Sequence, residues 1–143
     1  MTTTPSPIVY TATATSTGGR AGRATSSDGI LEVTLTAPKE LGGPGTGTNP
    51  EQLFAAGWSA CFTSALTTIA KKAGVDATDA QVTAHVGMGR DGSGFALTAE
   101  LDVRLPGVSL ETAQELADAA HQVCPYYNAT RGNIEVTVSV VED

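Results

Sequence analysis

The two cysteines of this 143-residue chain lie in settings that suit redox chemistry. Cys61 falls deep inside a long apolar stretch that predicts a helix. Cys124 falls where a second predicted helix ends, because Pro125 disfavours helical geometry at the residue before it. A thiol fixed inside one helix and a second thiol on a segment free to move are what a cycle of sulfenic acid and disulfide formation requires.

The alternative for Cys61 is purely structural, since a free cysteine often serves as a small buried hydrophobic residue. Burial raises the pKa of a thiol, and the start of the predicted helix is too distant from Cys61 to lower it. A reactive Cys61 therefore needs a cation from elsewhere in the chain. The candidates are Arg20, which follows two glycines, and Arg131, which lies beyond Cys124.

Glu51 has two interpretations that the sequence leaves open. It lies in the first turn of the predicted helix, where a carboxylate interacts favourably with the helix dipole. A carboxylate can also hold a guanidinium by two parallel hydrogen bonds, which would orient an activating arginine. Without such a partner, Arg20 would be a solvated arginine of a hairpin.

Charge and composition exclude several classes of function. The net charge is −7, and the few Lys and Arg residues are scattered, which argues against a nucleic-acid partner and is consistent with simple solubility. No run is expected to span a bilayer, and the N-terminus lacks the features of a signal peptide. A cytoplasmic location is therefore expected, where paired cysteines are more often redox-active or reduced than structural. His85 and His121 are too isolated to predict a metal site, and no bound cofactor is expected.

The length predicts one domain over residues 1–143. Alternating apolar residues and turn signals predict strands at 7–16, 31–36, 82–88, 95–105 and 134–140. One helix is predicted from the N-cap Asn49 to about Lys72, and another begins after Ser109. This order predicts an α+β domain of antiparallel strands with the helices on one side. The first helix is almost free of charge, so we expect another subunit to cover part of it.

Three segments together resemble a known family: Gly18-Gly19-Arg20, the run from Asn49 to Phe62, and the run from Val123 to Asn133. They closely resemble the organic hydroperoxide resistance (Ohr) branch of the Ohr/OsmC family, and the similarity extends over nearly the whole chain. The resemblance implies an OsmC-like α+β fold that forms an intertwined homodimer, with active sites at the subunit interface. It favours the redox interpretation of Cys61 over the structural one.

The activity that the resemblance implies is that of a thiol peroxidase without haem or metal, acting on organic hydroperoxides. Cys61 would be the peroxidatic cysteine and Cys124 the resolving one, with Arg20 and Glu51 as the activating pair. The implied reductant is dihydrolipoamide, carried by lipoylated proteins and regenerated by lipoamide dehydrogenase. Apolar neighbours of Cys61 along its helix, such as Trp58, also favour an organic tail over hydrogen peroxide.

Two positions depart from the family pattern. Ala21 stands where an Asp commonly follows the arginine, and Tyr127 stands where Ser is usual in the segment after Cys124. Two further hypotheses remain: a hydroperoxide or lipoyl sensor that is oxidised without turnover, and a member of the sister OsmC branch with a different substrate range. Glu51 and Cys61 are ten residues apart, about 15 Å along a straight helix, so Glu51 could serve the Cys61 of a partner chain.

Overall fold

The computed structural model describes residues 4–142, which divide into two compact units with a boundary between Leu53 and Phe54. The boundary falls within the first turn of the long helix α1 (Pro50–Lys72). Arg20 and Glu51 therefore belong to the N-terminal unit, and both cysteines belong to the C-terminal unit. A single domain over residues 1–143 stays a prediction.

The N-terminal unit contains an antiparallel sheet of three short strands, β1 (Ala14–Thr17), β2 (Arg23–Ser26) and β3 (Glu32–Thr34). The predicted turn at Asp28-Gly29 joins β2 to β3, and the Asp28 carboxylate accepts hydrogen bonds from Ser26 Oγ and from the N–H of Ile30. Two 3-10 turns, η1 (Gly19–Ala21) and η2 (Lys39–Leu41), complete this unit.

The first strand is shorter than the sequence predicts, because residues 7–13 form no strand. Its partner β2 ends at Ser26, which pairs with Ala14, and the chain then turns away. The segment before Ala14 consequently has no strand to pair with, and the side chains of Ile8, Val9 and Tyr10 remain exposed.

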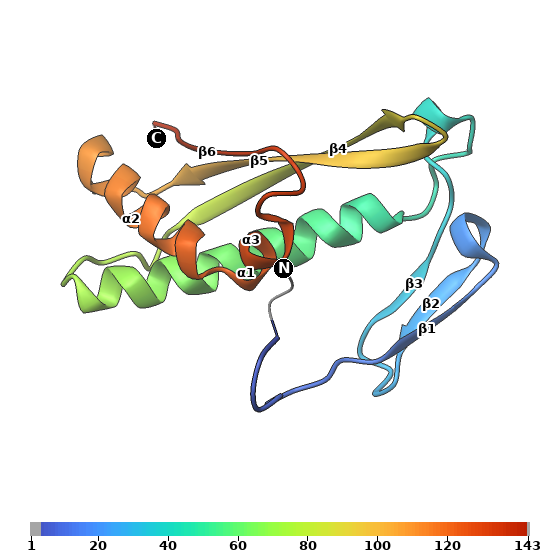
Figure 1. Ribbon diagram of the computed structural model, residues 1–143, viewed down its shortest axis with the longest axis horizontal. Helices are drawn as coiled ribbons and strands as arrows, with labels where there is room; N and C mark the ends of the chain where they lie inside the picture. The colour runs from blue at the N-terminus through green and yellow to red at the C-terminus, as the bar shows by residue number, and fades with distance from the viewer. Residues whose placement is uncertain (1–3, 143) are drawn as a thin grey trace. The chain divides into compact units, whose positions relative to one another are not determined.

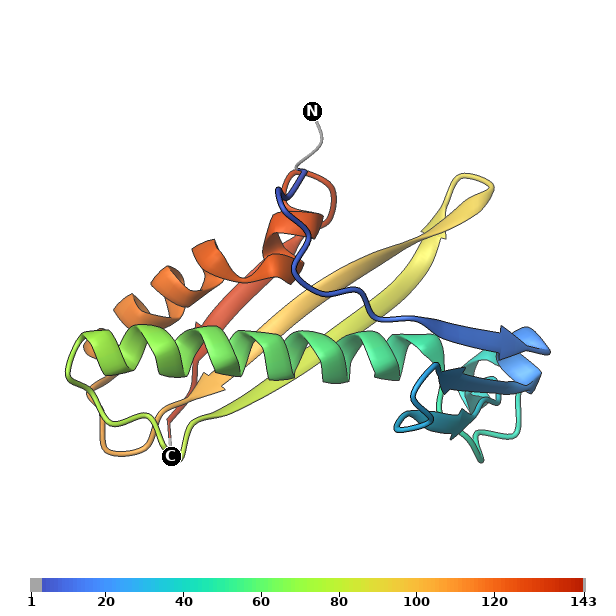
Figure 2. The same cartoon turned by 90° about the horizontal axis from the view of Figure 1, so that it is seen from below.

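The C-terminal unit contains the sheet β4 (Gln81–Asp91), β5 (Gly94–Arg104) and β6 (Val136–Val140), with α1, α2 (Leu110–Val123) and α3 (Pro125–Thr130). Figures 1 and 2 show α1 and α2 on the same side of this sheet. The predicted α+β class is confirmed. One pairing differs from the prediction, since β6 runs parallel to β5. The connection between them contains two helices, which is long enough for a parallel crossover.

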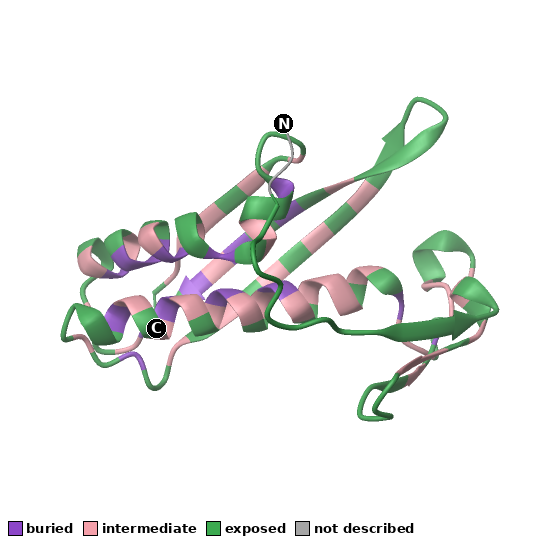
Figure 3. Ribbon diagram, turned by 60° about the horizontal axis from the view of Figure 1, so that its bottom comes forward, coloured by how far each residue is buried: buried purple, intermediate pink, exposed green. Residues whose placement is uncertain are grey.

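The core of the C-terminal unit lies between the helices and the inner face of the sheet. Buried residues form stripes along α1 and α2, as Figure 3 shows. On α1 they recur every four residues, at Trp58, Phe62, Leu66 and Ala70, which places them on one side of the helix. On α2, spacings of three and four predict an inward row that begins at Leu110 and continues through Ala113, Ala117 and Ala120. The last three are buried, but Leu110 is 48% exposed, and Leu116 is buried instead.

By length and composition alone, α1 could cross a membrane, contrary to the sequence expectation that no such run exists. A helix that fills a protein core has the same composition, and one stripe of α1 is buried in this way. The remaining sides of α1 are only partly covered within the chain. Whether the chain has a membrane partner therefore stays a matter of prediction.

Candidate active site

The sulfur atoms of Cys61 and Cys124 lie 3.9 Å apart, within reach of a thiol–thiol hydrogen bond. The two residues are 63 positions apart in the sequence, and both are free thiols. Cys61 is partly exposed, whereas Cys124 is completely buried. The Cys61 thiol can thus contact a molecule from the solvent, whereas the Cys124 thiol is shielded from solvent and adjacent to it.

Cys61 is positioned by the long helix α1. Its start is fixed by Asn49, whose Oδ1 accepts a hydrogen bond of 2.8 Å from the N–H of Gln52. The side chain of Gln52 accepts a hydrogen bond from Thr48 Oγ1. Cys61 lies immediately beside the buried stripe, next to Phe62, so its backbone is rigidly held while its thiol stays at the edge of the core.

Cys124 is positioned by a junction between two helices, and it caps α2 at one end and α3 at the other. Its N–H donates to the carbonyl of Ala120, and its own carbonyl accepts from the N–H of Asn128, each at 3.0 Å. Pro125 opens α3 as a proline suits the first position of a helix. The prediction that the second helix ends at Cys124 is confirmed, and the short helix α3 begins directly after it.

Burial is the main cause that raises the pKa of the Cys61 thiol, and the adjacent Cys124 adds to this effect. A hydrogen bond from the backbone N–H of Tyr126 acts in the opposite direction and lowers the pKa. The net shift of the Cys61 pKa is upward, so its thiolate form is disfavoured. A positive charge beside this thiol would lower its pKa and favour the thiolate.

The N-terminal unit holds a guanidinium in a fixed orientation. Arg20 donates to both oxygens of Glu51, from Nη1 to Oε1 at 2.7 Å and from Nη2 to Oε2 at 3.1 Å. This hydrogen-bonded pair raises the pKa of Arg20, which therefore remains charged. Glu51 serves both of its predicted purposes, since it also lies in the first turn of α1.

Glycines shape the turn that carries Arg20. Gly18 has a φ of 77°, in the left-handed region that favours glycine. A side chain at Gly22 would place its Cβ 1.7 Å from the carbonyl oxygen of Thr17, which is impossible without a shift of the backbone. The tight loop from β1 to β2 consequently depends on these glycines, and it presents Arg20 to Glu51.

Three aromatic rings gather between α1 and the segment that follows Cys124. Phe54, Trp58 and Tyr126 have ring centroids 5.5 to 5.9 Å apart. A Cβ added at Gly57 would lie 2.5 Å from the Tyr126 hydroxyl, so the missing side chain at this position makes room for the tyrosine. We refer to these three rings as the aromatic wall. Tyr126 is its only member outside α1, and it follows Cys124 by two residues.

A second group of side chains, which was not predicted from the sequence, lies around the Cys124 junction. The rings of His121 and Tyr127 have centroids 3.6 Å apart, and the guanidinium carbon of Arg131 lies 5.3 Å from the Tyr127 ring centroid. Arg131 also donates to Asn128 Oδ1 at 2.8 Å. Arg131, the alternative cation for Cys61, is thus engaged with Tyr127 and Asn128. The two adjacent tyrosines after Cys124 are the sequence feature from which an aromatic cluster could have been predicted.

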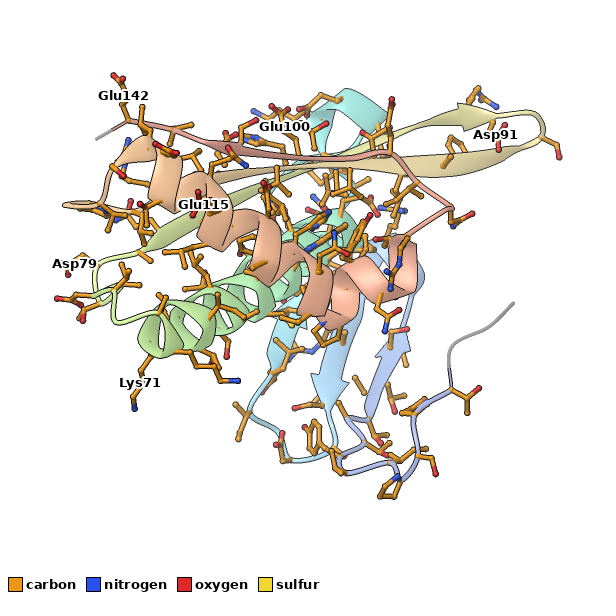
Figure 4. All side chains as sticks on the ribbon, turned by 60° about the vertical axis from the view of Figure 1, so that its left-hand side comes forward. Lys71, Asp79, Asp91, Glu100, Glu115 and Glu142 are labelled. Carbon is orange, nitrogen blue, oxygen red and sulfur yellow. The ribbon has the colours of Figure 1, made fainter. Side chains whose placement is uncertain are left out.

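Among the residues that the structure describes, the other titratable groups do not gather into a site. His85 Nε2 lies 2.9 Å from Asp102 Oδ2 on the exposed side of the sheet. The acidic residues labelled in Figure 4 are on separate elements around the C-terminal unit. Within residues 4–142, no cluster of three His, Cys, Asp or Glu side chains is arranged to hold a metal ion.

Fold and site together describe an α+β protein with a two-cysteine centre. The OsmC-like protein family matches residues 43–139, and the chain therefore belongs to the OsmC/Ohr family. It is 49% identical over 138 residues to the organic hydroperoxide resistance protein of Xanthomonas axonopodis pv. citri, covering 95% of this chain and 97% of that protein. It is 43% identical over 134 residues to OhrB of Bacillus subtilis, with 92% and 98% covered.

A solved structure agrees with these relatives. The crystal structure of an organic hydroperoxide resistance protein from Elizabethkingia anophelis superposes with a TM-score of 0.90 at 50% identity, covering 96% of this chain and 99% of that one. The predicted OsmC-like fold is thereby confirmed. Resistance to organic hydroperoxides is the function that the relatives support.

Proposed function

We propose that this chain is a thiol peroxidase that reduces organic hydroperoxides to alcohols. The observation that carries the proposal is the contact of 3.9 Å between the sulfur atoms of Cys61 and Cys124. One thiol is partly exposed on a rigid helix, and the other is buried next to it. Among relatives whose names refer to organic hydroperoxide resistance, this arrangement favours a catalytic cycle over a passive buried cysteine.

In the first step the Cys61 thiolate attacks one oxygen of the hydroperoxide. A sulfur–oxygen bond forms and the oxygen–oxygen bond breaks. The leaving alkoxide takes up a proton to become an alcohol, while Cys61 is oxidised to a sulfenic acid. In the second step Cys124 attacks the sulfenic sulfur, which releases water and forms the Cys61–Cys124 disulfide. The sulfurs must approach from 3.9 Å to about 2 Å, a short movement for a residue at a helix junction.

Arg20 and Glu51 are proposed to activate Cys61. The charged guanidinium would offset the burial that raises the thiol pKa, and it would stabilise the negative charge that develops on the leaving alkoxide. Glu51 would act on Arg20 alone, by holding both guanidinium nitrogens. The proposal requires Arg20 to approach a Cys61 thiol, either in the same chain or in a partner chain.

The cycle is completed by a dithiol that reduces the disulfide. We propose dihydrolipoamide, carried on a lipoylated protein and regenerated by lipoamide dehydrogenase, with the whole cycle in the cytoplasm. A dithiol suits this step because its first thiol forms a mixed disulfide with the protein. Its second thiol then attacks that mixed disulfide and releases the protein cysteine as a thiol. No metal and no bound cofactor takes part in the proposed chemistry, which uses only sulfur, oxygen and protons.

The reductant is tested by a steady-state assay with one organic hydroperoxide and three reductants. Dihydrolipoamide should support continuous consumption, and glutathione or thioredoxin should support much less. Comparable turnover with all three would refute a dedicated lipoyl reductant. Oxidation that stops after one equivalent with every reductant would instead indicate a sensor that does not turn over.

The aromatic wall predicts the substrate class. An alkyl tail that packs against the partly exposed rings of Phe54 and Tyr126 gains about 0.8 kcal/mol for each methylene removed from water, whereas hydrogen peroxide gains nothing. Cumene hydroperoxide should therefore react with reduced protein at least about 10-fold faster than hydrogen peroxide. Stopped-flow rate constants decide this, and equal constants for the two oxidants would contradict the prediction.

We propose further that the active unit is an intertwined homodimer. Large apolar side chains remain exposed in one chain, among them Phe95 at 61% and Ile30 at 86%, and most of α1 is only partly covered. A second chain would cover such surfaces. It would also allow Glu51 and its Arg20 to serve the partner's Cys61.

A mixed dimer tests whether Glu51 acts across the interface. One chain carries Cys61→Ser and the other carries Glu51→Ala, so the single intact Cys61 is on the Glu51→Ala chain. If Glu51 acts in trans, that Cys61 meets a normal carboxylate and the dimer should react at about half the wild-type rate, as expected for one site in two. If Glu51 acts in cis, the dimer should be as slow per site as Glu51→Ala alone. Oxidation kinetics on the isolated heterodimer distinguish the two.

A further inference from the structure

Two aromatic rings contact each other next to the Cys124 junction, and neither has a role in the proposed reaction. His121 is three residues before Cys124, and Tyr127 is three residues after it. Their ring centroids are 3.6 Å apart, so the stack closes a short loop of chain with Cys124 in the middle. Arg131 lies over the Tyr127 ring and extends the stack. We call His121, Tyr127 and Arg131 the junction clasp.

The two tyrosines after Cys124 contact different helices. Tyr126 packs with Phe54 and Trp58 of α1, whereas Tyr127 packs against His121 at the end of α2. The segment that follows Cys124 is consequently held on two sides. Phe62, the neighbour of Cys61, has its ring 6.4 Å from His121, so the clasp reaches towards the helix that carries the first thiol.

Hydrogen bonds to the backbone connect α3 with the residues of the junction clasp. Asn128 donates to the carbonyl of Cys124 at 3.0 Å, and Arg131 donates from its N–H to the carbonyl of Tyr127 at 2.7 Å. The hydroxyl of Thr130 donates to the carbonyl of Tyr126 at 2.9 Å. Because α3 has only six residues, these few bonds and the ring contacts are what fix its position.

Resting on the proposed function, we propose that His121 and Tyr127 are positioning residues for Cys124, whose stacked rings set the speed of disulfide formation without affecting the reaction with peroxide. The sulfenic acid on Cys61 has two fates. Attack by Cys124 gives the disulfide and water, whereas a second hydroperoxide gives a sulfinic acid and a second alcohol. A clasp that holds Cys124 within 3.9 Å of Cys61 favours the first fate.

The protonation state of His121 suits a ring that packs against Tyr127. Burial is the main cause that lowers the His121 pKa, Arg131 lowers it further, and Asp118 on the same helix raises it. The imidazole is therefore neutral at neutral pH, as stacking beside a guanidinium requires. Its Nδ1 is buried without a hydrogen-bond partner in the described part of the chain, so the ring is held by its contacts with Tyr127 and Phe62.

The test compares Tyr127→Ser, which removes the ring, with Tyr127→Phe, which keeps it. Reduced protein is treated with rising concentrations of cumene hydroperoxide, and mass spectrometry gives the ratio of disulfide to sulfinic acid. An aromatic pair contributes about 0.5–1.5 kcal/mol, so Tyr127→Ser should form sulfinic acid at roughly 2- to 10-fold lower peroxide concentrations. Tyr127→Phe should match the wild type, and the rate of the first oxidation should be the same in all three.

A second variant keeps the test decisive if Tyr127→Ser fails to fold. His121→Gln removes the other ring of the stack and should shift the ratio in the same direction. An unchanged ratio in the folded ring-deletion variants would overturn the inference, and so would a Tyr127→Phe protein that behaves like Tyr127→Ser. A wild type that forms no Cys61–Cys124 disulfide at any concentration would overturn the proposed function itself, which separates the two failures.

Discussion

Replacement of Cys61 by serine should reduce peroxide consumption to the background level. A serine hydroxyl at this position has no thiolate form and cannot cleave the oxygen–oxygen bond. The substitution is nearly isosteric, and Cys61 lies at the edge of the core, so the fold should persist. The measurement is hydroperoxide consumption with dihydrolipoamide, with circular dichroism to verify folding. A folded Cys61→Ser protein that still turns over would remove Cys61 from the mechanism.

The matched variant at the second cysteine should behave differently. Cys124→Ala avoids a buried hydroxyl at a completely buried position, and it should consume one equivalent of hydroperoxide at an initial rate no lower than that of the wild type, because Cys124 raises the pKa of Cys61. Turnover should then stop, because no neighbouring thiol can resolve the sulfenic acid. Mass spectrometry should show one added oxygen atom and then two at excess peroxide. Sustained dithiol-dependent turnover by Cys124→Ala would show that the reductant attacks Cys61 directly.

Replacement of Arg20 by alanine should have the next largest effect. A nearby opposite charge lowers the pKa of an acid by about 1–3 units, so its loss should raise the Cys61 pKa by that amount. Oxidation at neutral pH should slow by roughly 10- to 1000-fold. Burial already raises the pKa of Cys61, and loss of a nearby positive charge should raise it further. The oxidation rate should grow as pH rises through this pKa, so the rising part of the pH profile should move to higher pH in Arg20→Ala.

Two further variants control this experiment. Arg23 is an arginine of the same hairpin whose partner is the exposed Glu32, and Arg23→Ala should leave the pH profile unchanged because exposed pairs contribute little. Glu51→Gln should give a smaller shift than Arg20→Ala, since the guanidinium remains but loses one charge-assisted partner. Thiolate absorbance against pH measures each shift. A titration of Arg20→Ala that matches the wild type would assign the activating charge to another group.

The sequence predicted local structure well where patterns were strong. Asn49 and Pro50 mark the start of α1 correctly, and the turn at Asp28-Gly29 lies where its residue types require. The pairing of Arg20 with Glu51, 31 residues apart, was implied by the family resemblance, because a carboxylate and a guanidinium alone did not select Arg20 over Arg131. The start of α1 and the turn depend on neighbouring residues.

Features that depend on tertiary packing were not predictable in the same way. The direction of β6 depends on how the connection through α2 and α3 crosses the sheet, which alternation along the strand does not encode. Helix α3 was missed because its six residues are too few for a periodic pattern, although Pro125 after a capping residue is a usable signal. The stack of His121 on Tyr127 arises only once that helix folds back.

The most direct measurement follows the wild-type protein through one turnover. Fully reduced protein is mixed with one equivalent of cumene hydroperoxide, quenched, digested without reductant and examined by mass spectrometry, while the alcohol is quantified in parallel. The predicted result is one alcohol per chain and a peptide pair joined by a Cys61–Cys124 disulfide, which dihydrolipoamide converts back to two thiols. Consumption of the hydroperoxide without that disulfide, or no consumption, would contradict the proposed thiol peroxidase mechanism.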